Sequence, residues 1–347
     1  MQNVLYIDAS CFYGGAQASL HTLMEGRRAE EKQLLVAACR ELSPDVAIHT
    51  HHYMPNPVGL CQLWKDARQA RGAVAAALAE LRPDTVFLNT LRSALLWMAM
   101  RLAPDARIMV NDRDVRCPLL LPRVLDAMLH PDVLAVSRRV ALKWNFLPEG
   151  RLSVSPNVFD LEKIAATLPA RLPFTPGGLN VIMAGDFTEW KNHPLLLRAM
   201  EYVRKECPDA KCLLKGRVHT QQDAKYLLRL RSLLARKGLQ DCVFINADDE
   251  AALPYIAASD CLVSCSHDEP FGRTVVEALA LGKTVAATIL GADEELLADC
   301  TAISIAREEP RPLAEAILRW RTSESRAEVR QAALERAGRY ALVSKAF

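Results

Sequence analysis

The sequence predicts an α/β protein built from two doubly wound domains. Its 347 residues are more than a single core usually organises, and half of them are hydrophobic, which is enough for two cores. After residue 180, short apolar runs alternate repeatedly with helical patterns, and this alternation favours a parallel sheet with crossover helices. A segment rich in proline and glycine, residues 168–178, precedes this series and is the predicted linker.

The first domain begins with an apolar run at residues 4–7, followed by a loop that ends in Gly14 and Gly15 and by a helical pattern over residues 16–24. A strand, a glycine loop and a helix in this order are the usual opening of a doubly wound domain. A further helix is expected at residues 67–81, and further strands at residues 34–38, 85–89, 107–110 and 133–137.

Arg113 and Asp114 follow the predicted strand at residues 107–110. They therefore lie at the carboxyl end of a strand, where the functional sites of α/β proteins usually gather.

The second domain shows the same alternation. Strands are expected at residues 180–185, 212–216, 242–245, 261–266 and 284–290, with helices over residues 194–203, 224–237, 253–259 and 275–281. The last segment, residues 326–347, has a helical and basic character. We therefore expect a first domain over residues 1–170, a second over residues 171–330 and a C-terminal helix over residues 331–347.

The stretch from Glu269 to Glu277 joins a predicted strand to a predicted helix. Gly272 permits a tight turn, and Arg273 and Thr274 open the helix, where free N–H groups and the helix dipole favour a phosphate. Thr274 adds a hydroxyl donor. The two carboxylates then lie on either side of one phosphate pocket and can accept hydrogen bonds from hydroxyl groups. A phosphate flanked by two polyols, as in a nucleotide sugar, is the natural ligand of such a site.

The fifteen residues 269–283 resemble the E-x7-E motif of retaining glycosyltransferases with the GT-B fold, family 4 in particular. Residues 291–295 resemble, less closely, the family's Gly-Gly-x-Pro-Glu loop. The resemblance implies two Rossmann-type domains that face each other across a cleft. It also suggests that the last helix crosses back to the first domain.

The resemblance further implies roles for individual residues. Glu269 would hold hydroxyl groups of the transferred sugar, Glu277 would hold the ribose, and Lys191 would grip the diphosphate as a point cation. Glu269 and Lys191 are therefore the expected catalytic residues. The expected donor-binding set comprises Gly14, Gly15, Lys191, Gly216, Arg217, Glu269, Phe271, Gly272, Arg273, Thr274 and Glu277, and the expected acceptor-side residues are Arg113 and Asp114.

Two positions depart from the family's pattern. Asp186 follows Gly185 where the family usually has Gly-Arg, and Arg113 precedes Asp114 where it often has His-Asp. An acid that faces a diphosphate repels it. Asp186 is therefore expected to point elsewhere, or an arginine such as Arg217 or Arg273 must compensate its charge.

The function that the resemblance implies is that of a cytoplasmic, metal-independent, retaining transferase of the hexosyltransferase type without a cofactor. Its donor would be a nucleotide diphosphate sugar, and its acceptor a sugar, a lipid-linked molecule or a small molecule. Two alternatives stay open. One is a non-catalytic protein of the GT-B fold that binds a nucleotide sugar or a partner protein, and the other is an epimerase that acts on the nucleotide sugar itself.

Composition and short motifs exclude several other classes. The chain has 43 basic and 41 acidic residues, a formal net charge of +2, so bulk nucleic-acid binding is not expected. The first eight residues do not resemble a signal peptide. Ten cysteines without C-x2-C spacing indicate buried thiols in a reducing cytoplasm. The histidines at positions 49, 51 and 52 have no matching ligand set, so no metal site is expected.

Two basic and aromatic clusters in the first domain suggest weak peripheral contact with the inner membrane face. The members of these clusters are Trp64, Lys65, Arg68 and Arg71, and Arg138, Arg139, Lys143 and Trp144. A solvated helix face is the alternative interpretation of both.

Overall fold

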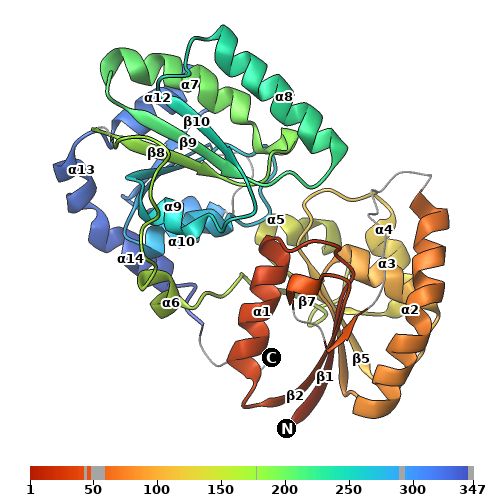
Figure 1. The fold of residues 1–347 in the computed structure, drawn as a ribbon. Coiled ribbons are helices and arrows are strands. Elements are labelled where there is room, and N and C mark those ends of the chain that lie inside the picture. The colour runs from red at the N-terminus through yellow and green to blue at the C-terminus, as the bar shows by residue number, and fades with distance from the viewer. Residues whose placement is uncertain (43–44, 48–58, 177, 289–293, 343–347) are drawn as a thin grey trace. The chain divides into compact units, whose positions relative to one another are not determined.

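The computed structural model describes residues 1–42, 45–47, 59–176, 178–288 and 294–342 (Figure 1). The chain divides into two compact units, and each is built around a parallel sheet of its own. The first unit comprises Met1–Phe159 together with Leu342–Phe347, and the second comprises Asp160–Ala341. Two parallel sheets with helical crossovers confirm the predicted α/β class with two Rossmann-like domains.

The first unit has a seven-stranded sheet in the order β3-β2-β1-β4-β5-β6-β7. Its strands are β1 (Gln2–Asp8), β2 (Glu31–Ala37), β3 (Val46–Ala47), β4 (Thr85–Leu88), β5 (Arg107–Asp112), β6 (Asp132–Ala135) and β7 (Leu152–Val154). The strand order reverses between β1 and β4, so the carboxyl ends of these two strands flank the position where ligands of such sheets bind.

Alternate residues of the first sheet point into two separate cores. Leu5 and Ile7 belong to the core that contains Trp97, whereas Tyr6 belongs to the core that contains Leu20. The first core is formed with α2 (Gly59–Leu81) and α3 (Leu91–Met100), and the second with α1 (Gly15–Arg27). The remaining helices of this unit are η1 (Arg40–Leu42), α4 (Leu121–Leu129), α5 (Arg138–Ala141) and η2 (Leu142–Trp144).

The second unit has a six-stranded sheet in the order β10-β9-β8-β11-β12-β13. Its strands are β8 (Asn180–Ala184), β9 (Lys211–Gly216), β10 (Val243–Ala247), β11 (Cys261–Ser264), β12 (Thr284–Thr288) and β13 (Ile303–Ala306). Val181 of β8 is in register with Cys212 of β9 on one side and with Cys261 of β11 on the other. The order reverses between β8 and β11, so the loops after these two strands lie side by side.

Helices cover both faces of the second sheet (Figure 1). One face packs against α7 (His193–Glu206), α8 (Gln221–Arg236) and α12 (Pro310–Leu318), while α9 (Leu253–Ala257) and α10 (Arg273–Ala280) pack on the other. The remaining helices are α6 (Leu161–Ala165), η3 (Glu189–Lys191), α11 (Glu294–Leu297), α13 (Ser323–Glu328) and α14 (Arg330–Gly338). In the described part of the chain, no helix is long and apolar enough to cross a membrane.

The described part of the segment expected to be helical, residues 326–342, contains the end of α13 and the whole of α14. The chain leaves helical geometry at Val329, and α14 ends at Gly338. The N–H of Leu342 then donates to the carbonyl oxygen of Phe159 over 2.8 Å, so a tertiary hydrogen bond takes the place of a further helical turn. Residues 343–347 lie outside the described part.

Candidate functional site

The loop between β11 and α10 places the predicted motif at a helix N-terminus. Gly272 caps α10 with a φ of +97°, a backbone conformation that side chains with a Cβ rarely adopt. Phe271 is buried beneath it, with its ring 5.4 Å from that of Tyr340 in an edge-to-face contact. Arg273 and Thr274 form the first turn of α10. The free N–H groups of this turn therefore begin directly after Glu269 and its turn, as an anion-binding site requires.

Glu269 is bound to Lys191, the residue predicted to grip a diphosphate. Lys191 Nζ lies 2.7 Å from Glu269 Oε2, and the two side chains are only 14% and 13% exposed. Ser266 Oγ donates a second hydrogen bond to the same oxygen over 3.1 Å. Lys191 Nζ also lies 4.0 Å from the centre of the Trp190 ring, a cation–π contact. The structure thus brings together the two predicted catalytic residues, and it adds Ser266 and Trp190, which sequence analysis missed.

Two glycines allow the Lys191 side chain to lie close to the sheet. A Cβ on Gly185 would lie 3.0 Å from Lys191 Cε, and the φ of Gly185 is +157°. A Cβ on Gly216 would lie 2.1 Å from the carbonyl oxygen of Gly185, which is too close for any side chain. Gly216, predicted to bind the donor, therefore has a packing role that keeps the loops after β8 and β9 in contact.

Glu277, the second carboxylate of the motif, lies one helical turn beyond Arg273. Arg273 Nη2 is 3.1 Å from Glu277 Oε1, and the side chains are 19% and 16% exposed. Burial raises the pKa of Glu277 above its usual value, and the neighbouring guanidinium opposes this shift. The carboxylate expected to hold a ribose is thus paired with the arginine expected to hold a phosphate.

Asp186 is paired with a histidine. His219 Nε2 lies 3.4 Å from Asp186 Oδ1, and this neighbouring carboxylate raises the pKa of His219. Arg217 Nη2 donates to the carbonyl oxygen of Asp249 over 3.2 Å. His219 was not singled out in the sequence because its position relative to Asp186 depends on the order of β8 and β9.

The predicted residues of the first unit lie at the carboxyl ends of β1 and β5. Gly14 is the N-cap of α1, and its N–H donates to Gln17 Oε1 over 3.1 Å. The Gln17 amide in turn donates to Asp8 Oδ2 over 3.0 Å. Arg113 donates to Asn157 Oδ1. Gly15 begins α1, and Asp114 is exposed directly after the end of β5.

Asp8 is a buried carboxylate that sequence analysis missed. In addition to Gln17, it accepts a hydrogen bond from Asn89 Nδ2 over 2.6 Å and one from the N–H of Ser10 over 2.8 Å. The sequence feature that could have indicated Asp8 is its place at the end of the first strand. Asp8 therefore orders the loop that leads to Gly14.

One of the two proposed membrane-facing clusters is not formed as expected. Trp144 is fully buried, and its Nε1 donates to Asp112 Oδ2 over 2.6 Å. Lys143 Nζ lies 2.9 Å from the same oxygen of Asp112. The expected membrane contact, and its alternative of a solvated helix face, are therefore both wrong for these two residues, because both side chains contact the buried carboxylate of Asp112. In the other cluster, Trp64 is 50% exposed and the guanidinium of Arg101 lies 5.3 Å from the centre of its ring.

Neither a metal-binding group nor a cysteine forms part of the candidate site in the described residues. The described residues contain no group of acidic, histidine and cysteine side chains that could hold a metal ion. The histidines at positions 49, 51 and 52 and residues 291–293 of the predicted loop lie outside the described part. Six cysteines are buried as expected, but Cys61 is exposed.

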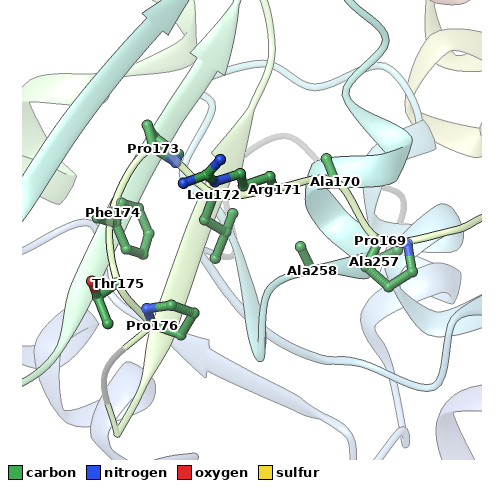
Figure 2. A pocket seen from close by; sticks show the side chains of 10 residues that line it. All are labelled: Pro169, Ala170, Arg171, Leu172, Pro173, Phe174, Thr175, Pro176, Ala257 and Ala258. Carbon is green, nitrogen blue, oxygen red and sulfur yellow. The ribbon is translucent and has the colours of Figure 1, made fainter.

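A cavity of about 760 Å³ lies between the predicted linker and α9 (Figure 2). Its lining consists of Pro169, Ala170, Arg171, Leu172, Pro173, Phe174, Thr175, Pro176, Ala257 and Ala258. This lining includes no residue of the predicted donor-binding set, so the cavity is separate from the candidate site.

Comparison with known proteins gives a consistent result. Residues 167–337 match the family described as "Glycosyl transferases group 1". The uncharacterized glycosyltransferase MJ1059 of Methanocaldococcus jannaschii is 25% identical over 147 residues, which are 40% of this chain and 34% of that protein. The match therefore spans about a third of the length of that relative.

Solved structures share the fold over nearly the whole chain. Anabaena HepE, solved in complex with UDP and glucose, has a TM-score of 0.78 and 17% identity, with 98% of this chain and 96% of that chain covered. Sucrose-phosphate synthase from Thermosynechococcus elongatus has a TM-score of 0.77 and 18% identity, with 98% and 95% covered. At these identities the likeness concerns the fold, and that fold is GT-B.

Proposed function

We propose that the protein transfers a sugar from a nucleotide diphosphate sugar with retention of configuration, because residues 167–337 match the glycosyl transferases group 1 family. The observation that carries the proposal is the ion pair between Lys191 and Glu269 beside the N-terminus of α10. A cation suited to a diphosphate and a carboxylate suited to sugar hydroxyls are within hydrogen-bond distance of each other at the ends of neighbouring strands.

In the proposed reaction, the protein contributes position and charge rather than a covalent intermediate. Lys191 and the N–H groups of the first turn of α10 stabilise the diphosphate as its bond to the sugar breaks. The leaving diphosphate takes the proton of the attacking acceptor hydroxyl. Glu269 holds the sugar by its hydroxyl groups, and Glu277 holds the ribose. Each of these roles depends on orientation, which lowers the entropic part of the barrier.

A UDP-sugar is the first donor to test, because Anabaena HepE has been solved with UDP and with UDP-glucose. The experiment is a thermal-shift screen with UDP, GDP and ADP and their sugars, followed by product analysis with a panel of acceptors. A ligand at 100 times its Kd stabilises a folded protein by about 2.7 kcal/mol. Stabilisation by one nucleotide together with transfer of its sugar is the expected result. If none of the nucleotides stabilises the protein, the proposed function is wrong.

We place the acceptor on the first unit, beside Arg113 and Asp114, and propose weak peripheral contact of this unit with a membrane. Exposed apolar side chains support the contact: Trp64 on α2, and Leu120, Val124 and Met128 at successive helical turns of α4 and the residue before it. An amphipathic surface of this kind binds lipid weakly and reversibly. Flotation with anionic and neutral vesicles tests it, and the absence of lipid binding would favour an acceptor in solution.

A second candidate function is a non-catalytic protein that binds a nucleotide sugar. Asp186 favours it, because this acid stands where the family usually has an arginine. The two candidates differ in one measurement. A transferase forms a glycosylated product, whereas a non-catalytic protein is stabilised by the nucleotide sugar and leaves it unchanged with every acceptor. An epimerase would convert the nucleotide sugar without any acceptor.

A further inference from the structure

Glu308 connects the two loops that carry Lys191 and Glu269. It lies between β13 and α12, a part of the chain to which no role has been assigned. Its Oε1 accepts a hydrogen bond from Asn192 Nδ2 over 2.8 Å, and the same oxygen is paired with His267 Nδ1. One carboxylate oxygen therefore joins the residue after Lys191 to a residue two positions before Glu269.

Asn192 is an unusual position in the backbone. It ends η3 and begins α7 with φ 59° and ψ 38°, the left-handed region that asparagine tolerates better than most residues. Its side chain is buried against Glu308, and Cys265 Sγ contacts its carbonyl oxygen at 3.4 Å. Lys191 is the last residue of η3 and directly precedes Asn192, so its orientation depends on this backbone conformation.

The other end of the connection is equally close to the site. The N–H of His267 donates to the carbonyl oxygen of Trp190 over 2.8 Å, and Trp190 is the residue whose ring lies beneath Lys191 Nζ. Backbone and side chain of His267 thus both contact the group around Lys191, the first directly and the second through Glu308. Loss of Glu308 would remove the side-chain link between Asn192 and His267, and the hydrogen bond from His267 N–H to Trp190 and the contact of Cys265 Sγ with Asn192 would have to hold the loops together here.

We infer that Glu308 is a positioning residue that sets the distance between Lys191 and Glu269 by holding Asn192 and His267 together. The inference rests on the proposed function for its catalytic meaning, since Glu308 is not among the residues expected to bind the donor. The geometric part stands alone: without Glu308, the ion pair between Lys191 and Glu269 loosens.

The first test needs no ligand. Acylation of Lys191 by an amine-reactive reagent is measured by mass spectrometry in the wild type, Glu308→Ala and Glu308→Gln, with Lys205 of α7 as the internal reference. A loosened pair exposes the amine, so the rate for Lys191 should rise several-fold in Glu308→Ala while the rate for Lys205 stays constant. Glu309→Ala is the matched control, because Glu309 is the next residue and its side chain makes no capping hydrogen bond to α12.

The conservative variant separates positioning from folding. Glu308→Gln keeps an oxygen acceptor for Asn192 but loses the charge opposite His267, so its Lys191 rate should lie between those of the wild type and Glu308→Ala. It also carries the test if Glu308→Ala does not fold. An unchanged Lys191 rate in a folded Glu308 variant overturns the inference, whether or not the protein binds a nucleotide.

The second test uses release of UDP from UDP-glucose. Residues that act through one another are non-additive in a double-mutant cycle. If Glu308 acts through the pair, Glu308→Ala should lower kcat in the wild type but have little further effect in Glu269→Gln. A purely structural role would instead give the same loss in both backgrounds, which would contradict the inference. Failure of the wild type to bind UDP would count against the proposed function, and the labelling result would still decide on Glu308.

Discussion

Lys191 Nζ and Glu269 Oε2 lie 2.7 Å apart, although the two residues are separated by 78 positions in the chain. Their loops follow β8 and β11, the neighbouring strands at which the order of the sheet reverses. A diphosphate that binds Lys191 competes with Glu269 for the same ammonium group. As the phosphates approach, Glu269 becomes available for the hydroxyl groups of the sugar. The ion pair therefore links recognition of the two halves of the proposed donor.

Lys191→Ala should weaken UDP binding and lower the rate of sugar transfer together. A partly buried, charge-assisted hydrogen bond contributes about 1.5–3 kcal/mol, which corresponds to roughly a 10- to 150-fold change in Kd. Isothermal titration calorimetry with UDP measures the effect. Lys205→Ala is the control, because Lys205 lies on α7 and is exposed. If UDP binds the Lys191 variant as tightly as the wild type, the phosphate site lies elsewhere.

Glu269→Gln should separate the nucleotide from the sugar. The glutamine retains an oxygen acceptor for Ser266 and for a sugar hydroxyl, but it lacks the charge that strengthens these bonds as the sugar leaves. We expect kcat to fall strongly and the Kd of UDP to change by less than about threefold, since removal of the carboxylate also frees Lys191. Steady-state kinetics and calorimetry on one preparation give both values. A parallel loss of UDP affinity would show that the two carboxylates have been assigned to the wrong parts of the donor.

Those parts of the site that depend on local sequence were predictable. The turn at Gly272, the first turn of α10 and the position of Glu277 within it follow from a strand, a tight loop and a helix in sequence. The pairing of Arg273 with Glu277 also follows from their spacing, since residues four apart are neighbours on a helix. Contacts between loops were not predictable, because they depend on which strands are adjacent.

The fold shows the same division between local and tertiary signals. Buried strands such as β8 and β11 were expected from apolar runs of the right length, whereas β13 and α12 were not predicted. β13 is an edge strand of four residues, and Ser304 interrupts its apolar run, so it lacks the continuous apolar pattern of the central strands. Trp144 was assigned to the surface because its neighbours are basic, and only the position of Asp112 at the end of β5 explains its burial.

The stability contributed by Glu277 should decrease as the pH rises. Burial raises its pKa in the folded protein above the usual 4.5, so the folded form retains a proton that the unfolded chain has lost. The contribution is complete below pH 4.5 and falls as the pH approaches the folded pKa. Urea unfolding of the wild type and Glu277→Gln between about pH 4 and pH 7 measures it. The free energy of unfolding of the wild type minus that of the variant should decrease as the pH rises.

The matched control for Glu277 is Glu315→Gln. Glu315 forms the same kind of pair with Arg311, four residues earlier on α12, with Oε1 3.3 Å from Arg311 Nε, but both side chains are largely exposed. The difference in the free energy of unfolding between the wild type and Glu315→Gln should hardly change with pH, because exposed ion pairs contribute little to stability. If the two variants show the same pH profile, burial does not govern the charge of Glu277.

Asp186→Asn should lower the pKa of His219 and raise the affinity for UDP above neutral pH. The neighbouring carboxylate of Asp186 raises the pKa of His219, so the pair stabilises the fold fully below the unfolded pKa of about 6.5 and loses this effect as the pH rises through the folded pKa. Once His219 is neutral, the imidazole no longer offsets the charge of Asp186, which then repels a diphosphate more strongly. NMR titration of the His219 ring and calorimetry with UDP near pH 6 and pH 8 measure both effects, and comparison between variants cancels the titration of UDP itself.

Glu189→Gln is the control, because Glu189 is an exposed acid of the same loop that pairs with Arg229. A lower pKa of His219 without any change in UDP affinity would mean that Asp186 does not face the phosphates. If Asp186→Asn and Glu189→Gln change the pKa of His219 and the UDP affinity equally, the pair of Asp186 and His219 does not have the role proposed for it.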